Sequence, residues 1–256
     1  MTPDYLTAPL LAETPGVRHA FFTRRGPGSG MDCALGQTAN DAERARRNRL
    51  LASRTLAGPA AGQPVIARQV HGRDVVTVDG PWPGQPPEAD GLVTRRPGVI
   101  LAVLTADCAP ALLADATAGV VAAAHAGWRG ALDGVLEATV DAMAALGAHP
   151  ARIRAAIGPC IGPSSYQVGP DFPAPFLARD AGDARFFRQA ADPDRLLFDL
   201  PGYAARRLAA CGVNAVAVLD ADTFADPRRF YSYRHGTQND GDKGGRQLSA
   251  IMLAAA

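Results

Sequence analysis

The sequence predicts an α/β (α+β) fold, in which a mixed β-sheet is covered by helices in a single-domain sandwich. Short apolar or β-branched runs are typical of strands, and stretches with apolar residues at helical spacing occur between some of them. Some of these strand-like runs follow one another closely, whereas others are separated by helices. This alternation favours a mixed sheet over a purely parallel one, although the spacing does not fix the strand order.

Seven runs predict strands because they are rich in Val, Ile, Leu and Ala and are bounded by turn-forming residues. Several lack alternation of polar and apolar residues, which indicates strands buried on both faces. The runs are 64–67, 75–78, 99–104, 111–113, 120–124, 153–157 and 213–219.

Three stretches predict helices: 41–52, which is rich in Arg and Ala, 131–146, and 201–211, which ends before Gly212. The Pro-rich stretch 81–87 resembles a linker but is too short to separate two domains. We therefore expect residues 1–256 to form one catalytic domain.

The composition is that of a globular protein, since 47% of the 256 residues are hydrophobic and 20% are charged. Lys plus Arg (26) nearly balance Asp plus Glu (25), so no global field attracts nucleic acid or an anionic membrane. The amino terminus lacks the pattern of a signal peptide, and no run has membrane-spanning length. The four cysteines are scattered, which favours reduced thiols. We expect a cytoplasmic monomer or weak homo-oligomer with neither nucleic-acid nor membrane partners.

Three segments each place a chemically competent side chain in a turn after an apolar run: His71, Cys108 and His125. Strand ends converge in a sheet, and loops at these ends carry function more often than strand interiors. Two imidazoles and one thiolate suit Zn²⁺, and three protein ligands leave a fourth position open, as in catalytic zinc sites.

Two other interpretations of these residues remain open, because the spacing matches no compact metal motif. Cys108 follows an apolar strand, where a buried cysteine usually only packs. Alternatively, Cys108 is a thiolate nucleophile with His125 as base and Asp107 or another acid as orienter. That arrangement predicts a metal-free hydrolase or transferase.

Three further segments offer anion or substrate contacts. Trp128 and Arg129 lie between Gly127 and Gly130 before a predicted helix, where amides and a guanidinium could meet a phosphate or carboxylate. The same glycines also suit a plain strand-to-helix turn. Cys160 lies in a rigid Gly- and Pro-rich loop, as a structural or a reactive thiol. The segments 230–235 and 243–246 form a second candidate anion site or a solvated loop.

Taken together, five motifs resemble those of the YfiH-like family, which includes purine nucleoside phosphorylases and the laccase-domain, or polyphenol oxidase, proteins. The resemblance extends from Phe21 to about Ile251. The motifs are Gln69–Gly72, Ala89–Leu92, Thr105–Cys108, Ala124–Gly130 and Gly158–Ile161.

The resemblance implies a catalytic zinc held by His71, Cys108 and His125 in a compact α/β sandwich with a mixed sheet. It also implies phosphorolysis of adenosine, inosine and S-methyl-5'-thioadenosine, and deamination of adenosine. Purine nucleosides and phosphate are thus the expected small-molecule partners. The resemblance does not fix the substrate contacts; Arg129 and Arg246 are physically sensible phosphate partners, and Cys160 is a further candidate substrate-binding residue.

The chain departs from the family pattern at two places that bear on these contacts. Residues 237–242 are an insertion before the segment that carries Arg246. Residues 31–36 differ from the family's usual run, although the Asn48–Arg49 pair that follows is kept.

Three other functions compete with the phosphorylase. A copper-dependent polyphenol oxidase uses the same ligands, but only five histidines are present, too few for a multicopper site. An amidase that edits cell-wall precursors, acting through the metal or as a thiol hydrolase, is a second alternative. A non-enzymatic metal-binding module is the third, and the polar, Gly-flanked setting of the ligands disfavours it.

Overall fold

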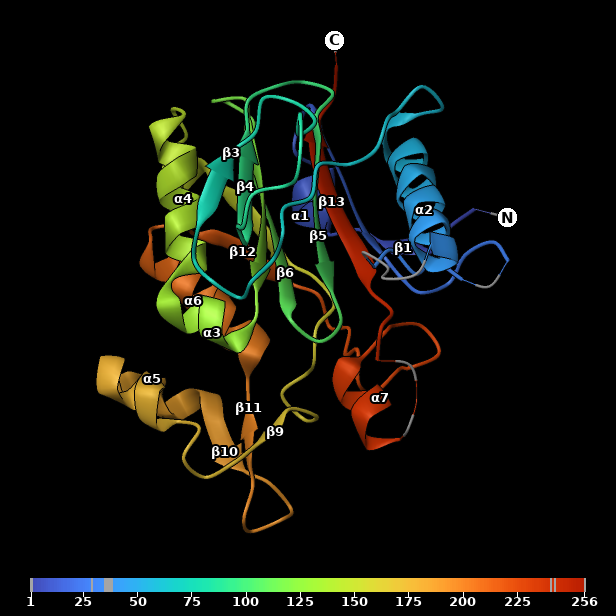
Figure 1. The fold of residues 1–256 in the computed structure, drawn as a ribbon. Helices are drawn as coiled ribbons and strands as arrows, with labels where there is room; N and C mark the ends of the chain where they lie inside the picture. Colours follow the sequence, from blue (N-terminus) through green and yellow to red (C-terminus); the bar gives the residue numbers. More distant parts are fainter. Residues whose placement is uncertain (1, 29, 35–38, 240, 242, 256) are drawn as a thin grey trace.

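Two β-sheets pack face to face, with helices on the outer side of each (Figure 1). The structure is a computed structural model that describes residues 2–28, 30–34, 39–239, 241 and 243–255. The first sheet has four strands, antiparallel throughout. In sheet order they are β1 (Tyr5–Leu6), β2 (Val17–Phe22), β13 (Gln247–Leu253) and β5 (Ile100–Thr105).

The second sheet has six strands and mixed direction. Its two edge pairs are parallel and its inner pairs are antiparallel, which confirms the predicted mixed sheet. The order is β12 (Ala215–Val218), β8 (Arg154–Ile157), β6 (Ala109–Asp115), β7 (Val120–Ala126), β4 (Gly91–Thr94) and β3 (Val75–Thr77).

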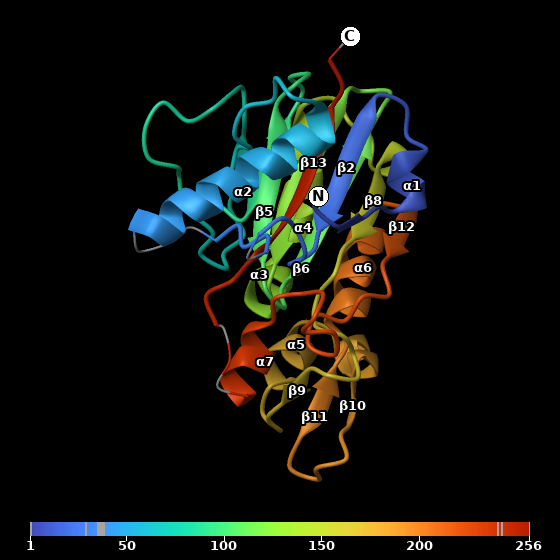
Figure 2. The ribbon, with the colours of Figure 1, turned by 90° about the vertical axis from the view of Figure 1, so that its right-hand side faces the viewer.

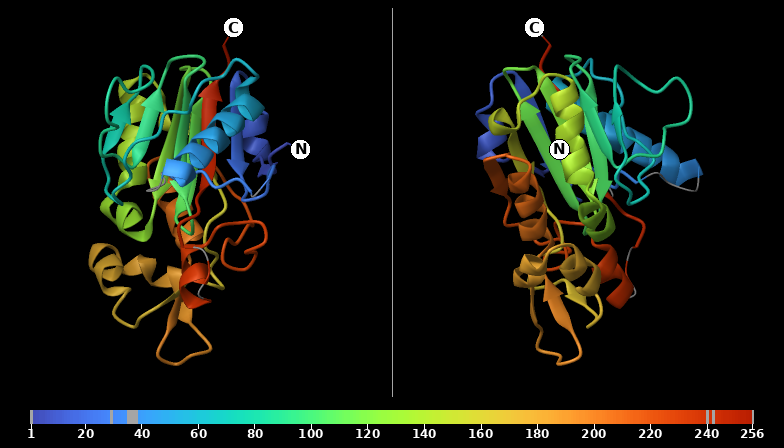
Figure 3. Two further views of the ribbon diagram at one scale, coloured as in Figure 1. Left: turned by 45° about the vertical axis from the view of Figure 1, so that its right-hand side comes forward. Right: turned by 90° about the vertical axis from the view of Figure 1, so that its left-hand side faces the viewer.

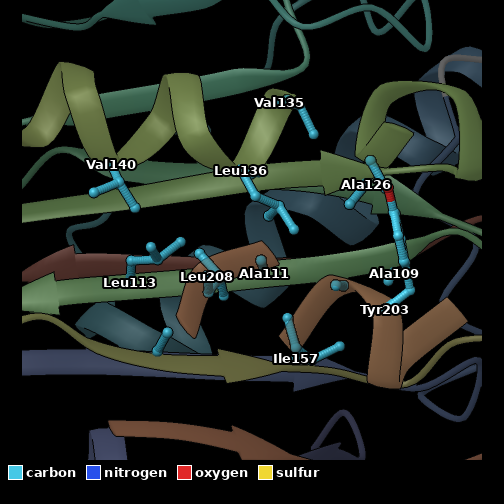
Figure 4. Close-up of a cluster of buried hydrophobic side chains, with 14 of the residues drawn as sticks. Ala109, Ala111, Leu113, Ala126, Val135, Leu136, Val140, Ile157, Tyr203 and Leu208 are labelled. Atoms are coloured by element: carbon cyan, nitrogen blue, oxygen red, sulfur yellow. The ribbon is translucent and has the colours of Figure 1, made fainter. Parts of the chain in front are cut away.

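Helices cover both outer faces of this sandwich. Helix α2 (Ala39–Ala57) crosses the four-stranded sheet (Figure 2). Helices α4 (Val135–Ala145) and α6 (Leu200–Ala210) cover the six-stranded sheet (Figure 3). Side chains from α4 and α6 pack over its apolar surface in Figure 4. The predicted fold class is confirmed, and no helix in the described ranges is long and apolar enough to cross a membrane.

The strands are apolar on both faces because each sheet is buried on both sides. In β5, Leu101 and Val103 face the second sheet, whereas Ile100, Ala102 and Leu104 pack under α2. The two rows alternate as the pleat of a strand requires. This double burial explains why the sequence shows continuous apolar runs here.

A smaller lobe lies below the sheets in Figure 1. It contains helix α5 (Ala174–Arg179) and a three-stranded antiparallel sheet. The lobe strands are β9 (Gln167–Val168), β10 (Phe187–Gln189) and β11 (Leu196–Phe198). Stacked phenylalanines fill its interior, for example Phe187 against Phe198 with ring centroids 4.9 Å apart. The short helix α7 (Tyr233–Gln238) lies beside the lobe.

Two predicted elements differ from the structure. Residues 64–67 form no strand, and only Val65 makes an isolated bridge, to Leu101. The predicted helix 131–146 is divided into α3 (Trp128–Asp133) and α4, because Gly134 has a left-handed φ of 103°. Strands β2 and β13 were not predicted, since Arg18, Gln247 and Ser249 interrupt the apolar pattern. The elements of the lobe were not predicted either.

We expect Gly134→Ala to lower the free energy of unfolding by about 1–2 kcal/mol, because a β-carbon is strained in the left-handed region. Urea denaturation measures the change. Gly84→Ala is the matched control: its φ is ordinary and no atom lies within 4 Å of the added methyl. The control should keep its stability or gain up to about 1 kcal/mol. Equal losses in both variants would contradict the assignment of strain to Gly134.

Candidate metal centre

The hairpin of β6 and β7 places Cys108 and His125 side by side. Ala109 pairs with Ala126 and Pro110 with His125, so Cys108 lies opposite Gly127 one step further along the same register. Cys108 also lies in the turn that leads from β5 in the first sheet to β6 in the second. Asp107 makes this crossing with a φ of 89°, an uncommon conformation for a residue other than glycine.

His71 approaches from a loop that is tied to both sheets. The side-chain amide of Gln69 donates to the carbonyl of Leu104 and accepts from its N–H, both at 2.8 Å. Gln69 thus pairs with the end of β5 as a neighbouring strand would. His71 itself has a φ of 59°, in the left-handed region that side chains rarely adopt. Strain of this kind often accompanies function when the surroundings hold it in place.

The three side chains converge on one point. One ligand atom from each of His71, Cys108 and His125 lies within 4.8 Å of the others. The Cys108 Sγ is 3.7 Å from the His71 Nε2, and the two imidazole rings are nearly perpendicular with centroids 4.8 Å apart. His125 is buried, Cys108 is half-buried and His71 is exposed. This group could hold a metal ion while one side stays open to solvent.

A buried carboxylate, Asp90, organises the group. Its oxygens accept from the backbone N–H groups of Val70 (3.1 Å), His71 (3.0 Å) and Gly72 (2.8 Å). Asp90 Oδ1 also lies 2.7 Å from the His125 Nδ1. Burial acts to raise the pKa of Asp90, but these hydrogen bonds outweigh burial and lower the pKa. The pairing directs the His125 Nε2 toward Cys108 and His71, as metal-binding histidines are usually oriented by an acid.

The charges of Cys108 and His125 stabilise each other. Burial alone would raise the pKa of the Cys108 thiol, but the charge of His125 and hydrogen bonds from both histidines lower it from 9.0 to about 6. Burial alone would lower the pKa of His125, but the Cys108 thiolate and Asp90 raise it to about 9. A thiolate at neutral pH is the form in which cysteine binds metals or acts as a nucleophile.

Gly127 and Gly130 allow the chain to pass close to these ligands. A β-carbon on Gly127 would lie 2.8 Å from the His71 Cδ2 and 3.1 Å from the Cys108 Sγ. A β-carbon on Gly130 would lie 2.8 Å from the carbonyl oxygen of Gly72. Close approach therefore requires glycine at both positions.

The three side chains line a cavity of about 970 Å³. Four arginines share the lining: Arg44, Arg68, Arg234 and Arg246. Trp128, Tyr166 and Tyr233 contribute aromatic surface, and the Arg234 guanidinium stacks on the Tyr166 ring at 5.2 Å.

The two lining carboxylates hold backbone in place. Asp32 accepts from the N–H groups of Ala34 (2.9 Å) and Arg246 (3.0 Å). Asp107 accepts from the Thr223 hydroxyl and the Arg234 N–H, both at 2.7 Å. Because four arginines outnumber these two carboxylates in the lining, the cavity suits an anionic ligand.

The other candidate residues lie at different places. Arg246 lines the cavity, and its Nη1 donates to the carbonyls of Lys243 (3.0 Å) and Gly245 (2.8 Å). Arg129 is exposed and is not among the lining residues; its guanidinium lies 4.9 Å from the centroid of the Trp128 ring. Cys160 is 3% exposed and lies outside the lining, next to Asp222, and burial raises the pKa of its thiol.

Sequence reasoning did not assign a role to Asp90 or Gln69. The acid beside His125 is Asp90 and not Asp107, whose carboxylate serves Thr223 and Arg234. Both missed residues lie in the motifs quoted above. An acidic residue between Ala89 and the apolar pair Leu92 and Val93 was the available signal for Asp90, because a buried carboxylate requires partners.

Comparisons with known proteins find similar sequences over nearly the whole chain. Residues 18–254 match the family model described as multi-copper polyphenol oxidoreductase laccase. A purine nucleoside phosphorylase of Deinococcus radiodurans is 40% identical over 97% of this chain and 95% of its own length. Purine nucleoside phosphorylase YfiH of Escherichia coli K12 is 40% identical over 81% and 79%, respectively.

Two solved structures share the whole fold. The YfiH protein of Bacillus licheniformis superimposes with a TM-score of 0.85 at 25% identity, over 98% of this chain and 97% of that one. YlmD of Geobacillus stearothermophilus gives a TM-score of 0.80 at 27% identity, over 98% and 96%. The chain therefore belongs to the YfiH-like family, whose model carries the laccase description.

Proposed function

We propose that this protein is a zinc-dependent purine nucleoside phosphorylase that cleaves adenosine, inosine and S-methyl-5'-thioadenosine with phosphate and also deaminates adenosine. The observation that carries the proposal is the His71–Cys108–His125 group in the wall of a cavity rich in arginine and aromatic side chains. Relatives over nearly the whole chain are named purine nucleoside phosphorylases. An enzyme of this class must hold an anion and an aromatic base together, and the lining offers partners for both.

The donor set fits zinc better than copper. Two imidazole nitrogens and one thiolate are ligands that Zn²⁺ prefers, and the exposed side of His71 leaves room for a further ligand. A multicopper oxidase needs further clustered histidines. The other histidines of the chain lie apart: His19 accepts from the Ala8 N–H, His149 accepts from the Ala151 N–H, and His235 packs on Phe224. Within the described ranges, no second group of candidate metal ligands occurs.

In this proposal the chain's own residues position the reactants. A bound zinc would supply Lewis-acid polarisation of an oxygen at the centre. Asp90 fixes the ring of His125, and Gln69 fixes the loop that carries His71. Arg246 supplies positive charge for phosphate from the cavity wall. Arg129 lies outside the cavity lining and stacks on Trp128, which lines the cavity, so its proposed role is to support that ring.

The lining around Cys108 also keeps the amidase and thiol hydrolase alternatives open to test. Its lowered pKa makes Cys108 a competent nucleophile, and His125 lies beside it as the acid or base. Metal dependence of the activity separates a zinc-dependent enzyme from a thiol hydrolase, because a thiol hydrolase needs no ion.

The test of the proposed function is a panel of purine nucleosides assayed with and without phosphate, on protein of measured metal content. We expect about one zinc per chain and phosphate-dependent release of free base from inosine. Adenosine should also yield inosine without phosphate. Less than a tenth of an equivalent of any metal, in protein never exposed to chelator, would refute the zinc centre. Phenol oxidation without nucleoside cleavage would favour the oxidase.

Replacing Cys108 by serine distinguishes a metal ligand from a nucleophile. We expect Cys108→Ser to lose zinc and activity together, because two histidines leave the ion underligated and serine is a poor ligand. Cys211→Ser is the matched control, since Cys211 follows the carboxyl end of α6, outside the cavity lining, and its thiol donates a hydrogen bond to the Arg207 carbonyl. The control should keep metal and activity. A folded, inactive Cys108→Ser protein with wild-type zinc would assign Cys108 as the nucleophile.

Replacing Asp90 by asparagine tests the organising carboxylate. An amide of the same size loses the charge that orients His125, so we expect zinc affinity to fall about 10–100-fold. The free energy of unfolding should fall by about 2–4 kcal/mol, because four hydrogen bonds converge on this group.

Competition with a metal chelator and urea denaturation measure the two effects of Asp90→Asn. The control is Asp79→Asn, which removes only an exposed pair with Arg96. It should change stability by less than about 1 kcal/mol. Unchanged zinc affinity in Asp90→Asn would remove Asp90 from its positioning role.

A further inference from the structure

One hydroxyl in the cavity wall has no partner. Thr105 is 1% exposed, and within the described part of the chain its Oγ1 makes no hydrogen bond. Thr105 belongs to the lining of the cavity. A buried polar group without a partner is costly and rare, so such a group calls for a ligand that completes it.

The position of Thr105 follows from the alternation of β5. Leu101 and Val103, two and four residues earlier, face the space between the two sheets, and Thr105 continues their row. On β7, His125 in the same way continues the row of Val121 and Ala123, which face that space from the other sheet. Both rows end at the cavity. The hydroxyl therefore lies on the inner face of one sheet, at the end where the opposite sheet presents the candidate metal ligand.

On its other side, Thr105 neighbours the segment that carries Arg246. Gln247 is the cross-strand partner of Thr105, and its side chain is occupied by the backbone of Tyr231, accepting at 2.8 Å and donating at 3.1 Å. Residues 244–246 precede Gln247 and line the cavity. Thr105 thus lies between the metal-ligand group and an arginine-bearing segment.

The hydrogen-bonding capacity and the surrounding charge of Thr105 indicate which kind of ligand group could bind there. A threonine hydroxyl can donate one proton to an oxygen, and the positive charge of the nearby wall favours an oxyanion. The lining carries four arginines against two carboxylates, so its balance of charge favours such an anion.

We propose that Thr105 is a phosphate-binding residue, which donates its hydroxyl proton to an oxygen of the inorganic phosphate held between His125 and Arg246. This inference rests on the proposed phosphorylase function and adds a specificity residue to it. Two other buried side-chain oxygens in the described part of the chain lack a hydrogen-bond partner, the Ser53 hydroxyl and the Oε2 of Glu137, whose Oε1 pairs with Arg207, but neither residue lines the cavity. Among the described residues, Thr105 is the one that both lines the cavity and has a buried oxygen without a hydrogen-bond partner.

The test compares Thr105→Val, Thr105→Ser and Ser53→Ala in the protein as purified with its metal. Valine keeps the shape and removes the hydroxyl, whereas serine keeps the hydroxyl. Ser53→Ala removes a hydroxyl that is equally buried and unpartnered, but on α2 and away from the cavity. Calorimetric titration with inorganic phosphate measures binding, thermal melting measures stability, and metal analysis confirms equal zinc content.

We expect Thr105→Val to bind phosphate about tenfold more weakly, and Thr105→Ser to bind within about threefold of wild type. The melting temperature of Thr105→Val should equal or exceed that of wild type, because an unsatisfied buried hydroxyl has been removed. Ser53→Ala should show the same gain in stability with unchanged phosphate binding. Loss of binding together with retained stability separates a ligand contact from a structural one.

Unchanged phosphate affinity in Thr105→Val would overturn the inference, as would a lower melting temperature with intact binding, which indicates a structural water. If Thr105→Val keeps wild-type affinity while wild-type protein cleaves inosine with phosphate, the inference fails and the proposed function stands. If Thr105→Val weakens phosphate binding but no nucleoside is cleaved, the inference stands and the proposed function fails. Wild-type protein that binds no phosphate would overturn the inference as well.

Discussion

The carboxylate of Asp90 is the constraint on which the candidate centre depends. It lies immediately before β4 of the six-stranded sheet and accepts from three successive backbone N–H groups of the loop that carries His71. The same carboxylate fixes the imidazole of His125 on the neighbouring strand β7. A buried charge is stable only when hydrogen bonds satisfy it, and here the groups that satisfy Asp90 are those that must be oriented. Stability and the geometry of the centre are therefore served by one interaction.

This arrangement also explains how two unusual backbone conformations persist. His71 and Asp107 both have positive φ angles, which cost energy in residues with a β-carbon. The His71 loop is held by Asp90 on one side and by Gln69 on the other. Asp107 is held through its own side chain by Thr223 and Arg234. Each strained residue lies in or beside the ligand group and is fixed by several hydrogen bonds.

Much of the fold could be predicted because double burial leaves a strong local signal. The apolar runs of β5, β6 and β7 predict strands, and the hairpin register then makes Cys108 and His125 neighbours. Strand β13 was missed because Gln247 and Ser249 look polar in sequence, although both are buried in the sheet. The break at Gly134 was visible as a glycine in a helical pattern, but its left-handed conformation depends on how α3 and α4 pack.

Prediction of the site was limited in the same way by long-range contacts. Cys160 and Arg246 come from equally suggestive loops, yet Arg246 lines the cavity and Cys160 lies behind the wall. No local pattern distinguishes them, because the difference is set by the pairing of Cys160 with Asp222, a residue far along the chain. The partners of Asp90 were not predicted for the same reason, because its carboxylate oxygens accept hydrogen bonds from residues 18–20 positions away in the sequence.

The turn 106–108 has a mechanical consequence for the whole sandwich. This turn connects β5 in one sheet to β6 in the other, and Cys108 is its last residue. His125 belongs to the second sheet, whereas the loop of His71 is tied through Gln69 to the first. An ion bound by all three side chains would cross-link the two sheets at one end. Movement of one sheet relative to the other would then be most restricted beside the cavity and least restricted at the opposite end of the strands.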